Sequence, residues 1–96
     1  MNYNFEWDPA KAKLNHQKHG IGFDLAATVF RDPLAVSVFD GSHSKTEDRW
    51  ITLGISSGGG MLVVHHTFEE LNEDTILIRI FSSRKATKNE ADQYGE

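Results

Sequence analysis

Asp74-Thr75-Ile76-Leu77-Ile78-Arg79-Ile80-Phe81-Ser82-Ser83-Arg84 is the stretch that decides the fold of this chain. In an extended conformation its three isoleucines lie on one face, and Leu77 and Phe81 lie on the other with Arg79 between them. Apolar residues on both faces are typical of a strand that is covered on both sides at the centre of a sheet. The Arg79 guanidinium therefore needs a carboxylate, a carbonyl or an anionic ligand as a partner.

The length of the chain limits it to one domain, residues 1–96, with one hydrophobic core. The absence of cysteine excludes disulfides and thiolate chemistry. No apolar run approaches the roughly 20 residues of a membrane helix, and the first residues do not form a signal peptide. We therefore expect a cytoplasmic protein without a membrane contact.

The net charge of −4 argues against a protein that grips polyanions with its whole surface. The charge is unevenly distributed, because residues 69–74 hold four acids and no base. We expect an acidic loop here, which leaves room for a local cationic site elsewhere or forms a contact surface for a basic partner.

Two helices are predicted in the first third of the chain. Asp8-Pro9 is a helix start, since Asp8 can cap the backbone and proline fits the first helical position. This helix runs over residues 10–19 and stops at Gly20, and its expected inward line is Trp7, Ala10 and Leu14. The second helix covers residues 23–30, whose apolar residues recur at helical spacing.

The remaining elements are strands and a last short helix. Alternating residues predict strands over 3–7, 34–39, 50–55 and 61–68, with a hairpin turn at 57–60. Thr87 and Glu90 fit a capping box for a helix that ends near Tyr94. The fold class is therefore α+β: a short N-terminal strand, two helices packed on one face of a four-stranded antiparallel meander, and a short C-terminal helix.

The ordered motifs of the chain resemble the BrnT family of bacterial toxins. The resemblance spans nearly the whole chain, and its most specific part runs over residues 7–30. It rests on Trp7-Asp8-Pro9, Lys11, Asn15, Lys18-His19-Gly20-Ile21, Phe23, Ala26, Val29-Phe30, Asp32-Pro33, Glu47-Asp48-Arg49, Gly54 and Ile78-Arg79-Ile80 followed by Ser83-Arg84-Lys85-Ala86.

This resemblance implies a RelE-like ribonuclease toxin of a type II toxin–antitoxin pair, which uses basic residues and no cofactor. It also implies a BrnA-like antitoxin as partner, with DNA contacted only through the antitoxin, and a homodimer or hetero-oligomer as the assembly. The family's basic and motif residues fall at Lys18, His19, Arg49, Arg79 and Arg84, with Lys85 as a further RNA-binding cation.

Two positions depart from the family pattern. An arginine expected after the hairpin glycine is replaced by Met61, and one expected after the third strand of the meander is replaced by the Phe68-Glu69-Glu70 run. Carboxylates beside an RNA groove repel phosphate. The departures favour an alternative in which the chain is a catalytically weakened binding module for a DNA-binding antitoxin.

Each candidate residue has a functional and a structural interpretation. Metal-free RNA cleavage needs proton transfer, for which His19 is the candidate, and charge stabilisation, for which Arg49, Arg79 and Arg84 are suited. Alternatively, His19 and Lys18 simply stabilise the end of a helix. Arg79 can equally pair with Glu47 inside the sheet, whereas Arg84 at the strand exit is harder to explain by architecture.

No metal site is expected from the five histidines. His16 and His19 are three residues apart on a helix, while His65 and His66 are adjacent on a strand and point to opposite faces. Aromatic residues including Phe39, Trp50 and Phe81 fall on apolar faces and are interpreted as core.

Overall fold

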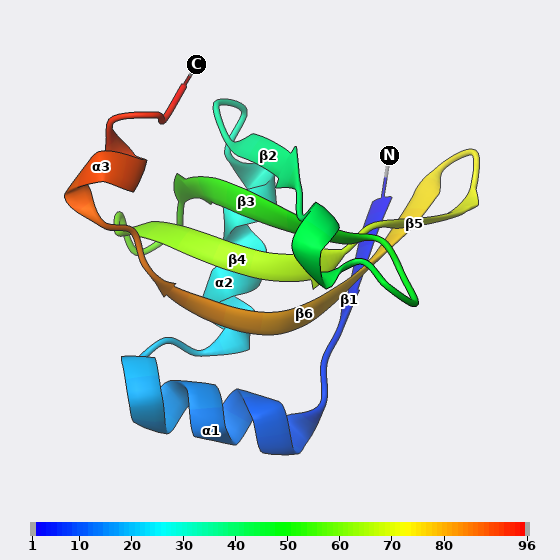
Figure 1. Ribbon diagram of the computed structural model, residues 1–96, viewed down its shortest axis with the longest axis horizontal. Coiled ribbons are helices and arrows are strands. Elements are labelled where there is room, and N and C mark those ends of the chain that lie inside the picture. The colour runs from blue at the N-terminus through cyan, green and yellow to red at the C-terminus, as the bar shows by residue number, and fades with distance from the viewer. Residues whose placement is uncertain (1, 96) are drawn as a thin grey trace.

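Six strands and three α-helices make up the chain in a computed structural model that describes residues 2–95 (Figure 1). Two short 3₁₀ turns, η1 and η2, complete it. The elements are β1 Asn2–Glu6, α1 Pro9–His19, α2 Phe23–Ala27, η1 Thr28–Arg31, β2 Val36–Phe39, η2 Gly41–His43, β3 Arg49–Ile55, β4 Met61–Thr67, β5 Glu69–Asn72, β6 Thr75–Lys85 and α3 Lys88–Ala91.

The strand quoted at the outset, β6, is an inner strand of the sheet and pairs with three other strands. The strand order is β1-β6-β4-β3-β2, and β5 also pairs with β6. The expected antiparallel meander is present as β2-β3-β4-β6, because each neighbouring pair in it is antiparallel. The sheet is larger than expected, since β1 adds to β6 in parallel and β5 adds to it antiparallel.

The acidic stretch is a strand rather than a loop. Glu69 and Glu70 pair with the start of β6, and Asp74 donates its backbone N–H to the Asn72 side chain at 2.9 Å in the tight turn between the strands. The four acidic residues gave no strand pattern, so the sequence predicted a loop here. Their side chains are exposed, so the acidic surface itself is present as expected.

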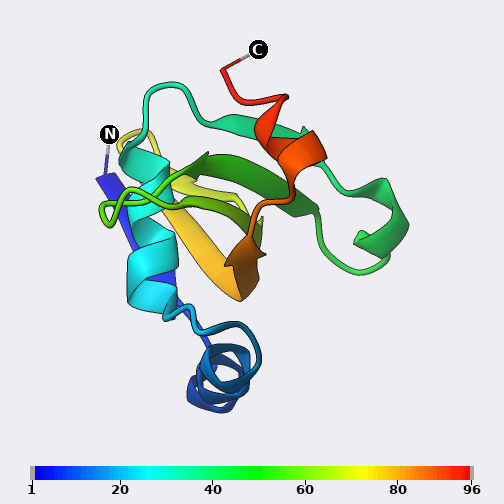
Figure 2. The same ribbon diagram turned by 90° about the vertical axis from the view of Figure 1, so that its left-hand side faces the viewer.

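The core lies between the sheet and α2, on the face that carries Ile76, Ile78 and Ile80 (Figure 2). These three side chains are at most 5% exposed and pack against Phe23, Ala26 and Val29 from the α2 segment. The opposite face of β6 is only partly covered, because Leu77, Arg79 and Phe81 are half-buried. The expectation that β6 is covered on both faces is therefore correct for one face.

The predicted second helix is divided in two. The α-helix ends at Ala27 and tightens into the 3₁₀ turn η1, which ends at Arg31. The Thr28 side chain donates a hydrogen bond to the Leu25 carbonyl at 2.6 Å and accepts one from the Ser57 N–H at 2.8 Å. The first bond uses the Leu25 carbonyl, and the second connects the turn to the β3–β4 hairpin. Both are consistent with the change from α-helix to 3₁₀ turn at this point.

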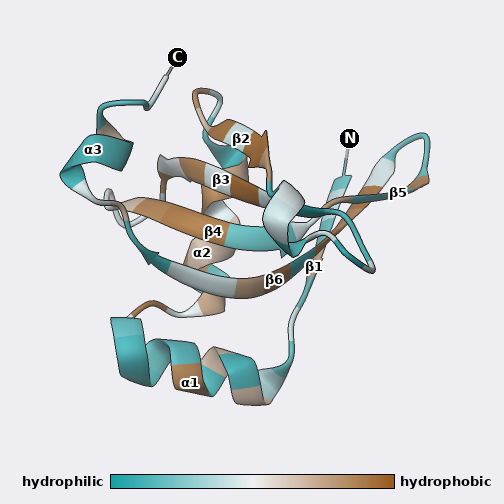
Figure 3. Ribbon diagram, viewed as in Figure 1, coloured by the Kyte–Doolittle hydropathy of each residue, from teal (hydrophilic) through white to brown (hydrophobic). Residues whose placement is uncertain are grey.

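Helix α1 lies along the edge of the sheet beside β6 rather than on its face (Figures 1 and 2). The predicted caps are confirmed: Asp8 accepts a hydrogen bond from the Ala10 N–H at 2.8 Å, and Gly20 adopts a φ of 71°. The predicted inward line is wrong for Leu14, which is 64% exposed, and for Ala10, which is also exposed, whereas Trp7 packs against the core as expected. Figure 3 shows that most of this helix is hydrophilic.

The buried residue of α1 is Asn15, and its amide extends the hydrogen-bond ladder of β6. The amide nitrogen donates to the Ser83 carbonyl at 2.9 Å, and the amide oxygen accepts from the Ser83 N–H at 3.1 Å. The same nitrogen donates to the Ile21 carbonyl at 3.1 Å. Beyond the end of β1, this side chain thus pairs with β6 as a neighbouring strand would.

The C-terminal helix α3 is shorter than predicted and ends at Ala91. Its capping box is confirmed, since Glu90 N–H donates to the Thr87 hydroxyl at 3.2 Å and Thr87 N–H donates to the Glu90 carboxylate at 2.8 Å. The following turn brings the Tyr94 hydroxyl to Asp32 at 2.5 Å. These contacts hold the end of the chain against the sheet.

Candidate functional site

A β-bulge in β6 shapes the partly covered face of the sheet. The partner of His65 is Ser82, whereas the partner of the next residue, His66, is Ile80, so that Phe81 is the extra residue. A bulge of this kind re-aims side chains. It places Phe81 and Ser82 together on a ridge that lines two neighbouring concave regions of the surface.

The first of these, cleft A, lies on the sheet face opposite α2, and the second, cleft B, lies between the sheet and α1. Their volumes are about 230 and 320 Å³. Cleft A is lined by Asp40, His43, Arg49, Trp50, His65, Phe81 and Ser82. Cleft B is lined by Lys11, Leu14, Asn15, Lys18, His19, Phe81 and Ser82. The Phe81–Ser82 ridge therefore separates two groups of basic residues that are distant in sequence.

Two cations contact the Phe81 ring. The guanidinium carbon of Arg49 lies 4.2 Å from the ring centroid, and the Lys11 ammonium lies 5.3 Å from it. Both distances are within the range of cation–π attraction. Phe81 is thus an anchor for charged side chains from β3 and α1, and its assignment to the core was wrong. Phe39, also expected in the core, is 50% exposed.

Arg49 and Arg79 share one acid. Arg49 lies 3.7 Å from the Glu47 carboxylate, and Arg79 donates to the other oxygen of the same group at 3.3 Å. Arg79 also donates to Glu6 on β1 at 2.9 Å. The Glu6 hydrogen bond in particular raises the pKa of Arg79. The interpretation of Arg79 as a member of an ion-pair network is therefore correct, and its guanidinium is shared between two carboxylates.

Arg84 is held by the C-terminal helix. Its two terminal nitrogens donate to the two Glu90 oxygens at 2.7 and 2.8 Å, a bidentate pair. This hydrogen bonding lowers the pKa of Glu90 to about 2. Architecture thus accounts for Arg84 after all, contrary to expectation. The neighbouring Lys85 is exposed at the end of β6.

Two imidazoles that the sequence reasoning did not select face cleft A. His43 on η2 has its Nδ1 atom 2.9 Å from an Asp40 oxygen. His65 on β4 is half-buried, and its pKa is lowered mainly by burial and further by the charge of Arg84. The spacing of a strand could show that His65 and His66 point to opposite faces, but the loop geometry that orients His43 has no signal in the sequence.

The structure brings three of the predicted residues to the ridge: Lys18 and His19 from α1, and Arg49 from β3. Arg79 is connected to Arg49 through Glu47, whereas Arg84, near the end of β6 just beyond Ser82, is paired with Glu90 of α3. The residues that line the clefts but were not predicted as site residues are Lys11, Leu14, Asn15, Asp40, His43, Trp50, His65, Phe81 and Ser82.

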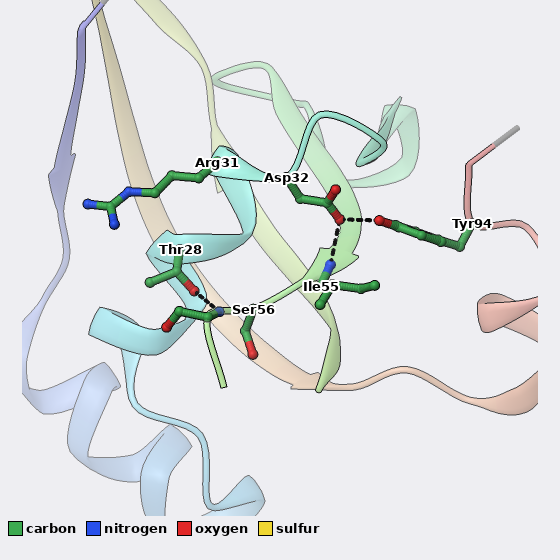
Figure 4. Close-up of a pocket in the computed structure, with 7 residues that line it drawn as sticks. Thr28, Arg31, Asp32, Ile55, Ser56 and Tyr94 are labelled. Atoms are coloured by element: carbon green, nitrogen blue, oxygen red, sulfur yellow. Dashed lines mark hydrogen bonds between the residues drawn. The ribbon is translucent and has the colours of Figure 1, made fainter. Parts of the chain in front are cut away.

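A third concave region has a structural explanation. Asp32 accepts hydrogen bonds from the Ile55 N–H at 2.8 Å and from the Tyr94 hydroxyl, as Figure 4 shows. The first of these bonds is the main cause that lowers the pKa of Asp32, and the carboxylate in turn raises the pKa of Tyr94 to about 12. This carboxylate is thus used to fasten β3 and the C-terminal turn.

Neither a metal centre nor a membrane segment is recognisable in the part of the chain that the structure describes. Within residues 2–95, no group of three or more His, Asp or Glu side chains could hold a metal ion. No described helix is long and apolar enough to cross a membrane.

The fold and the ridge define a small α+β domain that presents cations and imidazoles along one open face. The family model "Ribonuclease toxin, BrnT, of type II toxin-antitoxin system" matches residues 7–90, and the chain belongs to this family. The family resemblance inferred from the motifs is thereby confirmed. Membership of a type II toxin–antitoxin family implies an antitoxin partner.

A solved structure gives independent support for the fold. The chain is similar to the crystal structure of the Brucella abortus ribonuclease toxin BrnT, with a TM-score of 0.60 and 21% sequence identity. The similarity covers 92% of this chain and 100% of the solved chain. A comparison with curated proteins gives no match.

Proposed function

We propose that this chain is a metal-independent endoribonuclease toxin with a RelE-like way of holding RNA on its sheet and the adjoining helix. The observation that carries the proposal is the shared ridge: Phe81 and Ser82 line both clefts, and cations from α1 and β3 lie on its two sides. RNA is a polyanion, and a groove with cations on both sides can follow its backbone.

In this proposal Arg49 and Lys18 contact the phosphates, and Lys11 assists from the same helix. Arg49 is suited to this role because its planar fork stays charged and matches phosphate oxygens. Its pairing with Glu47 at 3.7 Å is long and its side chain is 37% exposed, so that the fork can accept another partner.

Arg79 and Arg84 contribute differently from Arg49. Both are tied to carboxylates, Arg79 to Glu6 and Glu47 and Arg84 to Glu90. A phosphate that contacts either guanidinium must displace or share a carboxylate oxygen. We therefore assign to Arg79, Arg84 and the adjacent exposed Lys85 a supporting role in the positive potential around the ridge.

His19 transfers a proton in the proposed reaction. The 2′-hydroxyl of the RNA attacks the neighbouring phosphorus, which requires that its proton be removed. His19 lines cleft B beside Lys18, at the C-terminal end of α1. An imidazole is the side chain that most often carries out proton transfer in enzymes.

The partner in this proposal is a BrnA-like antitoxin that contacts DNA on behalf of the pair. The complex is a hetero-oligomer, with a homodimer of the toxin as the other assembly to be tested, and the compartment is the cytoplasm. Type II membership supports an antitoxin of some kind.

The test is cleavage of RNA by the purified protein in EDTA. Wild-type protein should cleave, and Arg49→Ala should lose activity by about 100-fold or more, as expected when one preorganised charge donor is removed. Arg79→Ala and Arg84→Ala should show smaller losses once their folding is verified. Lys13→Ala is the matched control, because Lys13 is exposed on α1 and lines neither cleft.

A second candidate function is a catalytically weakened binding module that acts mainly as the partner of a DNA-binding antitoxin. This function is favoured by the carboxylates that form ion pairs with Arg79 and Arg84, and by the exposed acidic residues of the β5–β6 hairpin. Induction in bacteria separates the two functions: growth arrest that the antitoxin relieves supports the enzyme. Tight antitoxin binding without arrest, together with intact RNA in the EDTA assay, supports the module.

A further inference from the structure

The Asp40–His43 pair is built as an oriented imidazole. The His43 Nδ1 atom lies 2.9 Å from one Asp40 oxygen, and the Ser42 hydroxyl donates to the other oxygen at 2.9 Å. The Asp40 side chain is only 10% exposed, whereas that of His43 is 68% exposed. The carboxylate is thus held inside while the imidazole reaches outward, and Nε2 takes part in none of the hydrogen bonds found in the described part of the chain.

The loop that carries this pair is fixed to the start of β3, next to Arg49. The Asp40 N–H donates to the Arg49 carbonyl at 2.8 Å, and the Arg49 N–H donates to the Ser44 hydroxyl at 3.0 Å. Ser44 in turn donates to the Asp40 carbonyl at 2.5 Å. The imidazole and the Arg49 guanidinium consequently enter cleft A from one connected segment.

The position of the Asp40–His43 pair suits the second of two proton transfers in the proposed reaction. Cleavage at an RNA phosphate needs two proton transfers, one from the attacking oxygen and one to the leaving oxygen. Because the attacking and leaving oxygens lie on opposite sides of the phosphorus, the two groups must approach from opposite sides. His19 lines cleft B and His43 lines cleft A, and the Phe81–Ser82 ridge lies between them.

Building on the proposed function, we propose that the Asp40–His43 pair is the general acid that protonates the leaving 5′-oxygen of RNA. The phosphate is seated over the ridge. The 2′-oxygen gives its proton to His19 and forms a bond to phosphorus, the bond from phosphorus to the 5′-oxygen breaks, and His43 Nε2 delivers a proton to that oxygen. The products are a 2′,3′-cyclic phosphate and a free 5′-hydroxyl, with no change of oxidation state.

Asp40 acts as a positioning residue for the acid. Its carboxylate accepts the Nδ1 proton, which keeps Nε2 directed outward and balances the charge of the protonated imidazole. The hydroxyl of Ser42 fixes the carboxylate in turn. This is the arrangement by which a carboxylate sets the tautomer and orientation of a histidine.

His65 is the other imidazole in cleft A, and its surroundings make it unsuitable as the acid. It is half-buried, and the charged and titratable groups that influence it are Arg84, Asp40, His43 and Glu90. Burial is the main cause that lowers its pKa, so the charged ring that a general acid needs is disfavoured and the uncharged ring is favoured. His65 can hydrogen bond a phosphate oxygen in that state.

The test compares two RNA substrates that differ at one atom. In the second substrate, sulfur replaces the bridging 5′-oxygen at the cleavage site. A thiol has a pKa of about 8.5, far below that of an alcohol, so the sulfur leaves without a proton donor. His43→Gln should slow cleavage of natural RNA by about 10²- to 10⁴-fold, the usual contribution of an acid or base. It should slow cleavage of the sulfur substrate by less than about tenfold.

Other variants show whether the effect belongs to the acid. His19→Gln should slow both substrates equally, because attack by the 2′-oxygen is common to them. His16→Gln should leave both rates unchanged, since His16 is exposed on α1 and lines neither cleft. Equal losses of His43→Gln on both substrates, or no loss, would overturn the assignment while the ribonuclease function stands. Wild-type protein that leaves both substrates intact would overturn both.

Discussion

Replacement of Asn15 by alanine tests how α1 is held at the sheet. The Asn15 amide makes three hydrogen bonds at 2.9 to 3.1 Å, to the N–H and carbonyl of Ser83 and to the carbonyl of Ile21. Asn15 is 7% exposed and Ser83 is fully buried. In Asn15→Ala, three buried backbone groups lose their partner.

The cost follows from those three groups. A buried polar group without a partner costs about 1 to 3 kcal/mol. Partial relaxation and water entry limit the sum, so we expect a loss of about 3 to 5 kcal/mol in the free energy of unfolding. For a domain of this size, each kcal/mol lowers the melting temperature by about 4 to 8 °C. The melting temperature should therefore fall by at least about 12 °C.

Thermal unfolding followed by circular dichroism measures this effect, with Gln17→Ala as the matched control. Gln17 is an exposed amide on the same helix, and its loss should change the stability by no more than about 0.5 kcal/mol. If Asn15→Ala melts within about 4 °C of the wild type, the amide does not replace a strand at β6. The position of Lys18 and His19 beside the ridge would then need another explanation.

Two further predictions concern packing and pH. Gly54→Ala should destabilise the domain by about 1 to 3 kcal/mol, because the new Cβ would lie 2.8 Å from a Val29 methyl group. Gly60→Ala is the control, since no atom lies within 4 Å of the new Cβ there. Equal denaturation midpoints for the two variants would contradict this prediction. The hydrogen bonds from Arg84 lower the folded-state pKa of Glu90 from 4.5 to about 2. The pair therefore stabilises the folded domain fully above about pH 4.5, and this stabilisation is lost as the pH falls toward 2. Glu90→Gln should therefore reduce stability at pH 6 but not at pH 2, and an equal reduction at both would refute the assignment.

Local signals in the sequence predicted the elements that depend on local geometry. Asp8 and Gly20 bound α1 as expected, and Thr87 with Glu90 starts α3. The isoleucine alternation located the inner strand β6 and its core face. Caps and alternating faces are decided by residues a few positions apart, so one sequence is enough to find them.

Long-range pairing decided the features that the sequence did not reveal. The bulge at Phe81 is a property of the register between β4 and β6, and neither strand specifies it alone. The ladder contact of Asn15 joins residues 68 positions apart. Leu14 is exposed because α1 turns this buried amide, rather than its leucine, toward the sheet.

The candidate site shows the same division. The family motifs selected Lys18, His19 and Arg49, which the fold brings to the ridge from two directions. They also selected Arg79 and Arg84 but not the acids that pair with them. Glu6 and Glu47 are distant in sequence from Arg79, whereas Glu90 lies on α3 close to Arg84 in sequence, and only the fold shows that it turns back toward Arg84. The orientation of His43 depends on a 3₁₀ loop whose hydrogen bonds are visible only in three dimensions.

Salt-dependent binding of a short single-stranded RNA with 2′-O-methyl groups, which cannot be cleaved, tests most directly whether the two clefts act as one RNA site. Plots of log affinity against log salt should lose about 0.7 in slope for each phosphate contact removed, in Lys18→Ala from cleft B and in Arg49→Ala from cleft A. Lys13→Ala should keep the wild-type slope. Unchanged affinity and slope in either cleft variant would contradict the account.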